Sequence, residues 1–155
     1  MIFLTHLLGG VLALVYFGHY TGIASIGGGK IVAIATAMLF SVLPDIDTVK
    51  SKAGKTLQPF STVISLVFRH RGFLHSFIFT AIVYFGTRYI FSPAIAAAAV
   101  IGYSSHLLLD SLTKEGIMPF WPLSKMKLKG FIKTGGLAEK LVFAVMMALL
   151  LLRLV

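Results

Sequence analysis

Apolar residues along the chain gather into five long runs, interrupted by two polar segments. Several of these runs approach the roughly 20 residues that an α-helix needs to cross the hydrocarbon core of a bilayer. The second run is the least regular. Its firmly apolar part, residues 31–43, covers only about 20 Å as a helix, so the helix either begins earlier, through residues 23–29, or does not fully span. The pattern predicts helices over about residues 2–17, 23–43, 73–91, 94–112 and 137–152.

The two polar segments, residues 45–72 and 113–136, are predicted to be loops. In the first, apolar residues between Leu57 and Phe68 recur at helical spacing, which indicates a short helix lying in the membrane surface. In the second, Lys125–Lys129 alternates with period two, which is typical of a short strand, and Trp121 suits the headgroup region.

Composition supports a single membrane-embedded domain over residues 1–155, folded as an all-α polytopic bundle of about five transmembrane helices with the short interfacial helix. Hydrophobic residues make up 57% of the chain, and mean hydropathy is +0.93. The absence of cysteine excludes disulfides and thiolate chemistry. The net charge of +9 could indicate nucleic acid, but no nucleic-acid motif accompanies it, so we expect no such partner.

The basic residues set the expected orientation. Counted with Lys140, the two polar loops hold 11 of the 14 lysines and arginines. Two predicted helices separate these loops, so the loops share a side, and the positive-inside rule makes that side cytoplasmic. We therefore expect a multi-pass protein of the inner (cytoplasmic) membrane, with its N-terminus in the cytoplasm and its C-terminus outside.

Residues able to bind a metal gather at the cytoplasmic ends of these helices. His106 and Asp110 are four apart on a helix and project from one face. Asp45 and Asp47 follow a helix that Pro44 ends, so they can point together into a shared cavity. The predicted ligands are Asp45, Asp47, His70, His75, His106 and Asp110, with His6 and Glu139 as further members.

Each of these residues also has a simpler interpretation. The His106–Asp110 pair could be a helix-stabilising contact, the two aspartates a helix-end cap, and His6 a lone interfacial histidine. Charged groups this near hydrocarbon are costly unless they are paired or functional, and their coincidence on four helices favours a common site. A His/Asp site without thiolate suits zinc first and manganese or iron as alternatives, and more than four ligands would allow two ions.

The motifs that contain these residues resemble a known family. They are Thr5-His6-Leu-Leu-Gly-Gly, Leu-Pro-Asp45-Ile-Asp47, His70-Arg71-Gly72 to His75-Ser76, and Gly102-Tyr-Ser-Ser-His106 to Asp110. Together they resemble the YdjM-type membrane-bound metal-dependent hydrolases, one branch of which is LexA-regulated, over nearly the whole chain. The Pro-Asp-x-Asp and His-x-x-x-Asp elements are also similar to those of zinc-dependent phospholipase C and P1-type nucleases, whose ligating N-terminal Trp this chain lacks. The resemblance implies a hydrolase with ligand roles for the matched residues.

The expected reaction is hydrolysis of a phosphoester in a lipid or lipid phosphate. A divalent ion lowers the pKa of a water bound to it, and a second ion polarises the phosphate. We expect Asp45, His75 and Arg71 to be catalytic, with the Arg71 guanidinium holding the phosphate and Arg69 and Lys114 assisting. The competing interpretations are a metal or proton transporter and a metal-stabilised membrane scaffold. An intramembrane metalloprotease is disfavoured, because the His-Glu-x-x-His motif is absent.

Overall fold

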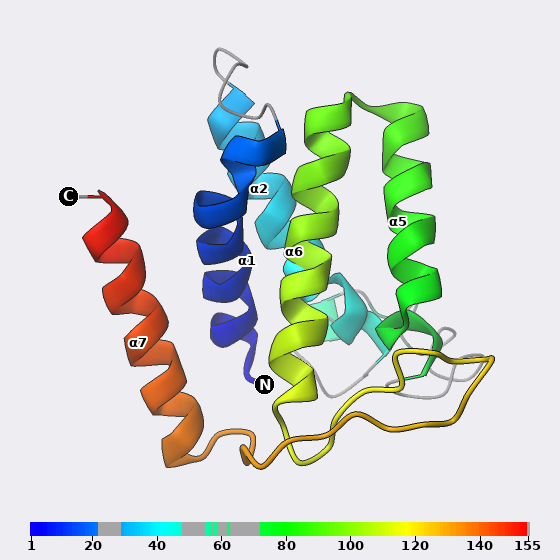
Figure 1. Cartoon of the computed structure of the whole chain (residues 1–155), viewed down its shortest axis with the longest axis vertical. Helices are drawn as coiled ribbons and strands as arrows, with labels where there is room; N and C mark the ends of the chain where they lie inside the picture. The colour runs from blue at the N-terminus through cyan, green and yellow to red at the C-terminus, as the bar shows by residue number, and fades with distance from the viewer. Residues whose placement is uncertain (22–28, 48–54, 57, 59–61, 63–71, 155) are drawn as a thin grey trace.

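A computed structural model shows five long α-helices in the part of the chain that it describes (Figure 1). The structure describes residues 1–21, 29–47, 55, 56, 58, 62 and 72–154. Within those ranges there are helices and isolated bridges but no strand, so the prediction of an all-α fold is confirmed. The helices are α1 (Phe3–Phe17), α2 (Gly29–Val42), α5 (Phe77–Ile90), α6 (Pro93–Ser111) and α7 (Leu137–Leu154), and the 3₁₀ turns are η1 (Gly18–Thr21), η3 (Leu43–Asp47) and η4 (Phe73–His75).

Among the described residues, three helical segments are long and apolar enough to cross a membrane. They run over Phe3–Thr21, Gly29–Asp47 and Pro93–Ser111, each of 19 residues, and α5 is a shorter apolar helix. Large apolar side chains also point outward, among them Ile31, Tyr89 and Leu152, which are 77%, 93% and 76% exposed. Outward apolar side chains are what a lipid solvent favours.

The central helix is α6, which packs against α1, α2 and α5. Its crossing with α2 is very close, because a Cβ atom added at Gly102 would lie 2.2 Å from the Ala37 carbonyl oxygen. Gly10 of α1 approaches α2 in the same way, with an added Cβ 2.7 Å from the Ser41 Cβ. Small residues thus hold α1, α2 and α6 in tight contact, as membrane helix interfaces require. Helix α7 contacts α1 and stands at the edge of the bundle (Figure 1).

Two predicted helix boundaries differ from the structure. The helix expected from residue 73 begins at Phe77, because Ser76 has an extended backbone and its hydroxyl accepts a 3.2 Å hydrogen bond from Phe79 N as an N-cap. His75 therefore lies on the preceding 3₁₀ turn. The helix expected over 23–43 continues as η3 to Asp47, while residues 22–28 are outside the described ranges. The interfacial helix expected between Leu57 and Phe68 also falls almost wholly outside them.

The segment between α6 and α7 crosses one end of the bundle (Figure 1). Isolated bridges join Ile117 to Leu128 and Thr113 to Ile132, so only Leu128 of the expected strand at 125–129 pairs with another residue. The segment is tied to the start of α5 by a 2.8 Å hydrogen bond from Phe77 N to the Pro119 carbonyl. It therefore closes the end of the bundle at which η3, η4 and the last turn of α6 meet.

Candidate metal centre

Polar side chains from four elements converge at this closed end, inside an otherwise apolar bundle. His6 comes from α1, Asp45 and Asp47 from η3, His75 from η4, and His106 and Asp110 from α6. The side chains of the three histidines and of Asp47 and Asp110 are fully buried, and that of Asp45 is 15% exposed. The structure thus brings together six of the eight residues predicted as ligands.

The tightest group is a triangle of His75, His106 and Asp110. His75 Nε2 and His106 Nε2 lie 3.3 Å apart, and each is 3.7 Å from Asp110 Oδ2. Ligand atoms about 2.0–2.2 Å from a tetrahedral zinc ion are separated from one another by about 3.4 Å. The three edges of the triangle therefore match one face of a tetrahedral coordination sphere.

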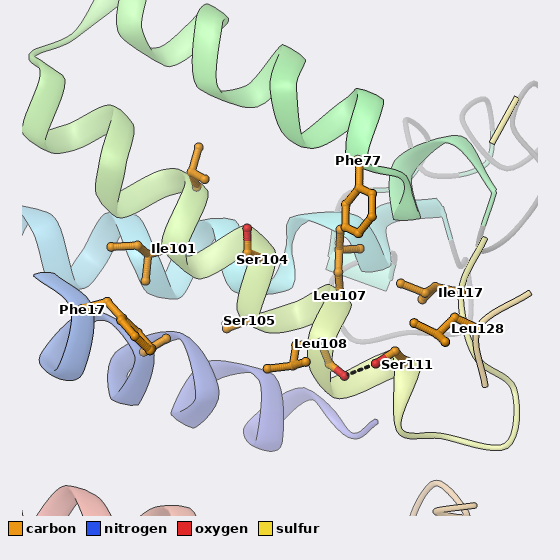
Figure 2. A pocket seen from close by; sticks show the side chains of 12 residues that line it. Phe17, Phe77, Ile101, Ser104, Ser105, Leu107, Leu108, Ser111, Ile117 and Leu128 are labelled. Carbon is orange, nitrogen blue, oxygen red and sulfur yellow. Dashed lines mark hydrogen bonds between the residues drawn. The ribbon is translucent and has the colours of Figure 1, made fainter. Parts of the chain in front are cut away.

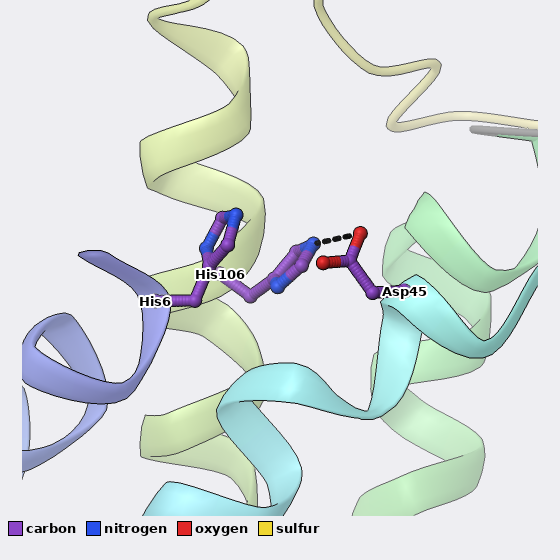
Figure 3. Close-up of side chains that lie close together, drawn as sticks. All are labelled: His6, Asp45 and His106. Atoms are coloured by element: carbon purple, nitrogen blue, oxygen red, sulfur yellow. Dashed lines mark ion pairs between the residues drawn. The ribbon is translucent and has the colours of Figure 1, made fainter. Parts of the chain in front are cut away.

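A second group shares His106 with the first. It contains His6 and Asp45, and its ligand atoms all lie within 4.8 Å of one another (Figure 3). The rings of His6 and His106 stack with centroids 3.8 Å apart, and His106 Nε2 is 4.0 Å from Asp45 Oδ1. His6 thereby extends the cluster from α6 to α1.

A backbone carbonyl fixes the orientation of His106. Its Nδ1 lies 2.7 Å from the Ser41 carbonyl oxygen, which can only accept, so Nδ1 carries the proton and donates it. The Nε2 lone pair is then directed at His75 and Asp110. A hydrogen bond to the far ring nitrogen is the usual way in which proteins orient a metal-binding histidine.

His75 has a comparable arrangement on its outer side. Its Nδ1 lies 3.3 Å from Asp47 Oδ2, while its Nε2 faces the triangle. Asp47 belongs to neither of the two metal-capable groups found in the described part of the chain. The structure therefore places Asp47 behind a predicted ligand, where it can orient the ring, although the sequence pattern grouped it with the ligands.

The donor set fits a divalent cation. Three imidazoles and two carboxylates are the nitrogen and oxygen ligands that zinc, manganese and iron accept. Both ring nitrogens of His6 and the Thr5 hydroxyl are buried without a hydrogen-bond partner among the described residues, although His6 Nε2 is 3.3 Å from Asp110 Oδ1. Buried polar atoms without partners are costly in a protein interior, and a bound ion would engage one of the two ring nitrogens of His6.

Glu139 is not part of this cluster. Its Oε1 accepts a 2.6 Å hydrogen bond from Ile2 N, and its Oε2 accepts one of the same length from Gly135 N. The carboxylate thus joins the start of α7 to the start of α1 and to the preceding turn. The N-terminal ammonium group of Met1 lies nearby and contacts Asp110 Oδ1.

Of the three side chains predicted to bind phosphate, only Lys114 lies within the described residues. Arg69, His70 and Arg71 lie outside the described residues. Lys114 is exposed on the segment after α6, and its backbone N–H donates to the Ile132 carbonyl at 2.9 Å. The ligand role of His70 and the catalytic role of Arg71 therefore stay predictions.

Sequence reasoning missed two contributors to the cluster. The Tyr103 hydroxyl donates to the Leu74 carbonyl and so holds η4 against α6, next to His75. Tyr103 lies three residues before His106 and seven before Asp110, so a helical-face count would have found it. The Ser41 carbonyl carries no signal in the sequence, because any residue supplies one.

Comparison with known proteins assigns the chain to a family. A family model described as "YdjM inner membrane protein" matches residues 1–155. The chain belongs to the YdjM family. It is 35% identical to "Uncharacterized protein YvsG" of Bacillus subtilis (strain 168) over 142 residues, which cover 90% of this chain and 86% of YvsG.

Two further YdjM-family relatives match a shorter part. The chain is 40% identical to "Inner membrane protein YdjM" of Escherichia coli (strain K12) over 96 residues, which cover 57% of this chain and 48% of that protein. The same figures hold for the protein of that name in Shigella flexneri. No solved structure matches. Family membership and the apolar helices together identify the chain as a membrane protein.

Proposed function

We propose that this YdjM-family protein is a membrane-bound metal-dependent hydrolase that cleaves a phosphoester in a lipid or lipid phosphate at the cytoplasmic leaflet. The observation that carries the proposal is the triangle of His75 Nε2, His106 Nε2 and Asp110 Oδ2, with edges of 3.3, 3.7 and 3.7 Å. A buried His/Asp triangle of this size is a costly arrangement for a purely structural role in a membrane protein.

His75, His106 and Asp110 would hold the ion, and His6 lies where it can complete the coordination. When bound, a divalent cation supplies Lewis-acid activation of water and of a phosphoryl oxygen. Because His106 Nδ1 donates to Ser41, only its Nε2 is available to the site, and the histidine serves a single ion.

Asp45 is the proposed general base. It is the one cluster carboxylate in the described residues with an exposed fraction above 1%, at 15% for the side chain, so it can reach both water and substrate. A carboxylate at this position would take the proton of the attacking water. Asp47 and the Ser41 carbonyl would hold the two imidazoles still while this happens.

Substrate charge favours the same end of the bundle. The segment at 113–136 carries five lysines and one glutamate, a net charge of +4. Such a segment raises the local concentration of anionic lipids. From the sequence, Arg71 adds a guanidinium that can hold a phosphate through two hydrogen bonds. The placement of this end in the cytoplasm rests on the positive-inside rule.

Metal or proton transport is less well supported. A transporter needs polar groups near the middle of its spans. In the described helices, the hydroxyls of Thr36 and Thr80 donate to the carbonyls of Val32 and Ser76, one turn earlier, at 2.7 and 3.1 Å. These hydroxyls are satisfied within a single helix, so they offer little to a passing ion.

The test is a hydrolysis screen with purified protein. The substrates are phosphatidic acid, phosphatidylglycerol and a chromogenic phosphodiester, each with chelator and with added zinc, manganese or iron. We expect release of phosphate or of a phosphorylated headgroup that chelator abolishes and one metal restores. Asp45→Asn should lower the rate by about 10²–10⁴-fold with little loss of metal binding, as expected for a general base.

A control variant and a melting measurement complete the test. His19→Ala changes an exposed histidine that packs on Tyr20 at the far end of α1, so it should leave hydrolysis unchanged. If chelator lowers the melting temperature but no substrate is cleaved under any metal condition, the protein is a metal-stabilised scaffold and the hydrolase proposal is wrong.

A further inference from the structure

The face of α6 that points away from the metal cluster lines a long apolar groove (Figure 2). The groove has a volume of about 500 Å³ and lies between α1, α6, the start of α5 and the segment after α6. Phe17 and Ile101 line one end of it, and Phe77, Ile117 and Leu128 line the other (Figure 2). Leu108, which is 66% exposed, lies on its floor.

The groove is apolar even where serines line it. Ser105 Oγ donates to the Gly102 carbonyl at 2.7 Å, and Ser111 Oγ donates to the Leu108 carbonyl at 2.6 Å. Both hydroxyls are therefore satisfied by the helix itself. A hydrocarbon chain along this wall would meet the hydroxyl of only one further serine, Ser104, which is exposed.

Its length matches one leaflet of a bilayer. The lining residues of α6 run from Val100, near the middle of the Pro93–Ser111 span, to Ser111 at its end. At 1.5 Å per residue this is about 17 Å. Half of a bilayer's hydrocarbon core is about 15 Å thick. The groove therefore extends from the bilayer midplane to the headgroup region at the lysine-rich end.

Positive charge lies at the headgroup end. Leu128 closes the groove there, and its chain neighbours Lys127 and Lys129 are both exposed, as is Lys125. The segment is held against α6, because Gly130 N donates to the Thr113 carbonyl at 3.0 Å and Ile132 N donates to the Leu112 carbonyl at 3.0 Å. The backbone of this segment, which carries Lys127 and Lys129, thus has a defined position at that end of the groove.

We propose that this groove binds an anionic phospholipid, with an acyl chain along α6 and its headgroup phosphate at Lys127 and Lys129. An apolar groove of one-leaflet length with cations at its headgroup end complements such a lipid in both shape and charge. None of the residues that line the groove belongs to the metal cluster, so the site is separate from the proposed active site. The inference holds whether or not the protein is a hydrolase.

The experiment is lipid titration of the full chain in a non-ionic detergent, followed by native mass spectrometry. The probes are phosphatidylglycerol and phosphatidylcholine with the same acyl chains. We expect one phosphatidylglycerol per chain at concentrations at which phosphatidylcholine is not retained. Lys127→Gln with Lys129→Gln should weaken phosphatidylglycerol binding roughly 10- to 30-fold and leave phosphatidylcholine unchanged.

Leu108→Trp should remove the bound lipid by filling the groove. The matched control is Leu141→Trp, on an exposed site of α7 that lines none of the described grooves, and Lys30→Gln is the control for charge. Both controls should bind as the unmodified chain does. If Leu108→Trp does not fold, Ser104→Phe, at another exposed position in the groove, replaces it.

Three results would overturn the proposal. One is lipid binding by Leu108→Trp that equals that of the unmodified chain. Another is equal affinity for the two lipids. The third is a dimer that Leu108→Trp dissociates, which would make the groove an interface between two copies of the chain.

Discussion

The two faces of α6 differ in burial and polarity although they belong to one helix. One face carries Tyr103, His106 and Asp110, all with 0% exposure, and meets α2, η3 and η4. The other carries Leu108, which is 66% exposed, and lines the apolar groove. On the first face every polar atom needs a partner within the protein, because it is removed from water. On the second, lipid is a sufficient partner.

Truncating a buried side chain of α6 should therefore cost more stability than truncating an exposed one. Leu107 borders the groove, but it is 3% exposed and packs with Val83, Tyr103 and Ile117. Leu107→Ala should therefore cost about 2–5 kcal/mol of stability, because a cavity remains inside the bundle. Leu108→Ala, one residue along, should cost no more than about 0.5 kcal/mol. Thermal unfolding of both variants in the same detergent measures the loss of stability in each. Equal losses would mean that the two faces do not differ as described.

Metal binding should belong to the buried face alone. His106→Ala removes the residue that both metal-capable groups share. The stabilisation that added metal gives the unmodified chain, about 2.7 kcal/mol at a concentration 100 times the Kd, should then vanish. His19→Ala should keep it in full. The readout is the difference in melting temperature with zinc and with chelator, and a full zinc response in His106→Ala would contradict the assignment.

Close packing of α6 on α2 is a further constraint on the buried face. Gly102→Ala places a methyl group 2.2 Å from the Ala37 carbonyl oxygen and should cost about 1–3 kcal/mol. Gly86→Ala on α5 is the matched control, because nothing lies within 4 Å of an added Cβ there. It should be neutral or gain up to about 1 kcal/mol from helix propensity. Denaturant titration of both variants would show the opposite signs, and the same sign in both would refute the close crossing.

The smallest expected effect concerns the orientation of His75. Asp47→Asn keeps the size of the side chain and removes its charge, 3.3 Å from His75 Nδ1. We expect metal affinity to fall about 10- to 100-fold while the fold and the number of bound ions are kept. Asp110→Ala, which removes a ligand of the triangle itself, is the comparison. Competition with a fluorescent chelator measures both affinities, and an unchanged Kd in Asp47→Asn would remove the orienting role.

Much of this arrangement could be predicted from the sequence. The hydrophobic runs give α1, α6 and α7 nearly to the residue, because long apolar periodicity is a strong signal. The convergence of His6, Asp45, His75, His106 and Asp110 can be predicted because polar groups are rare in such a chain. Counting the predicted helices and loops puts these residues at the same end of the bundle.

The remaining features depend on tertiary contacts that a linear pattern does not contain. The start of α5 was placed four residues early, because Phe73 and Leu74 are as apolar as the helix that follows, and only the Ser76 cap interrupts it. Asp47 was grouped with the ligands, because spacing alone cannot tell a carboxylate that faces an ion from one behind a histidine. Glu139 was included for its position at a helix start, where backbone amides bind it instead.

The most direct test of the metal centre is an anomalous-scattering map from crystals of the purified protein grown with zinc. The account predicts a peak bounded by His75 Nε2, His106 Nε2 and Asp110 Oδ2, about 2.0–2.2 Å from each, and no such peak in His106→Ala. A map without a peak at these three residues, or with one that persists in His106→Ala, would contradict the assignment of the buried face of α6 as a metal site.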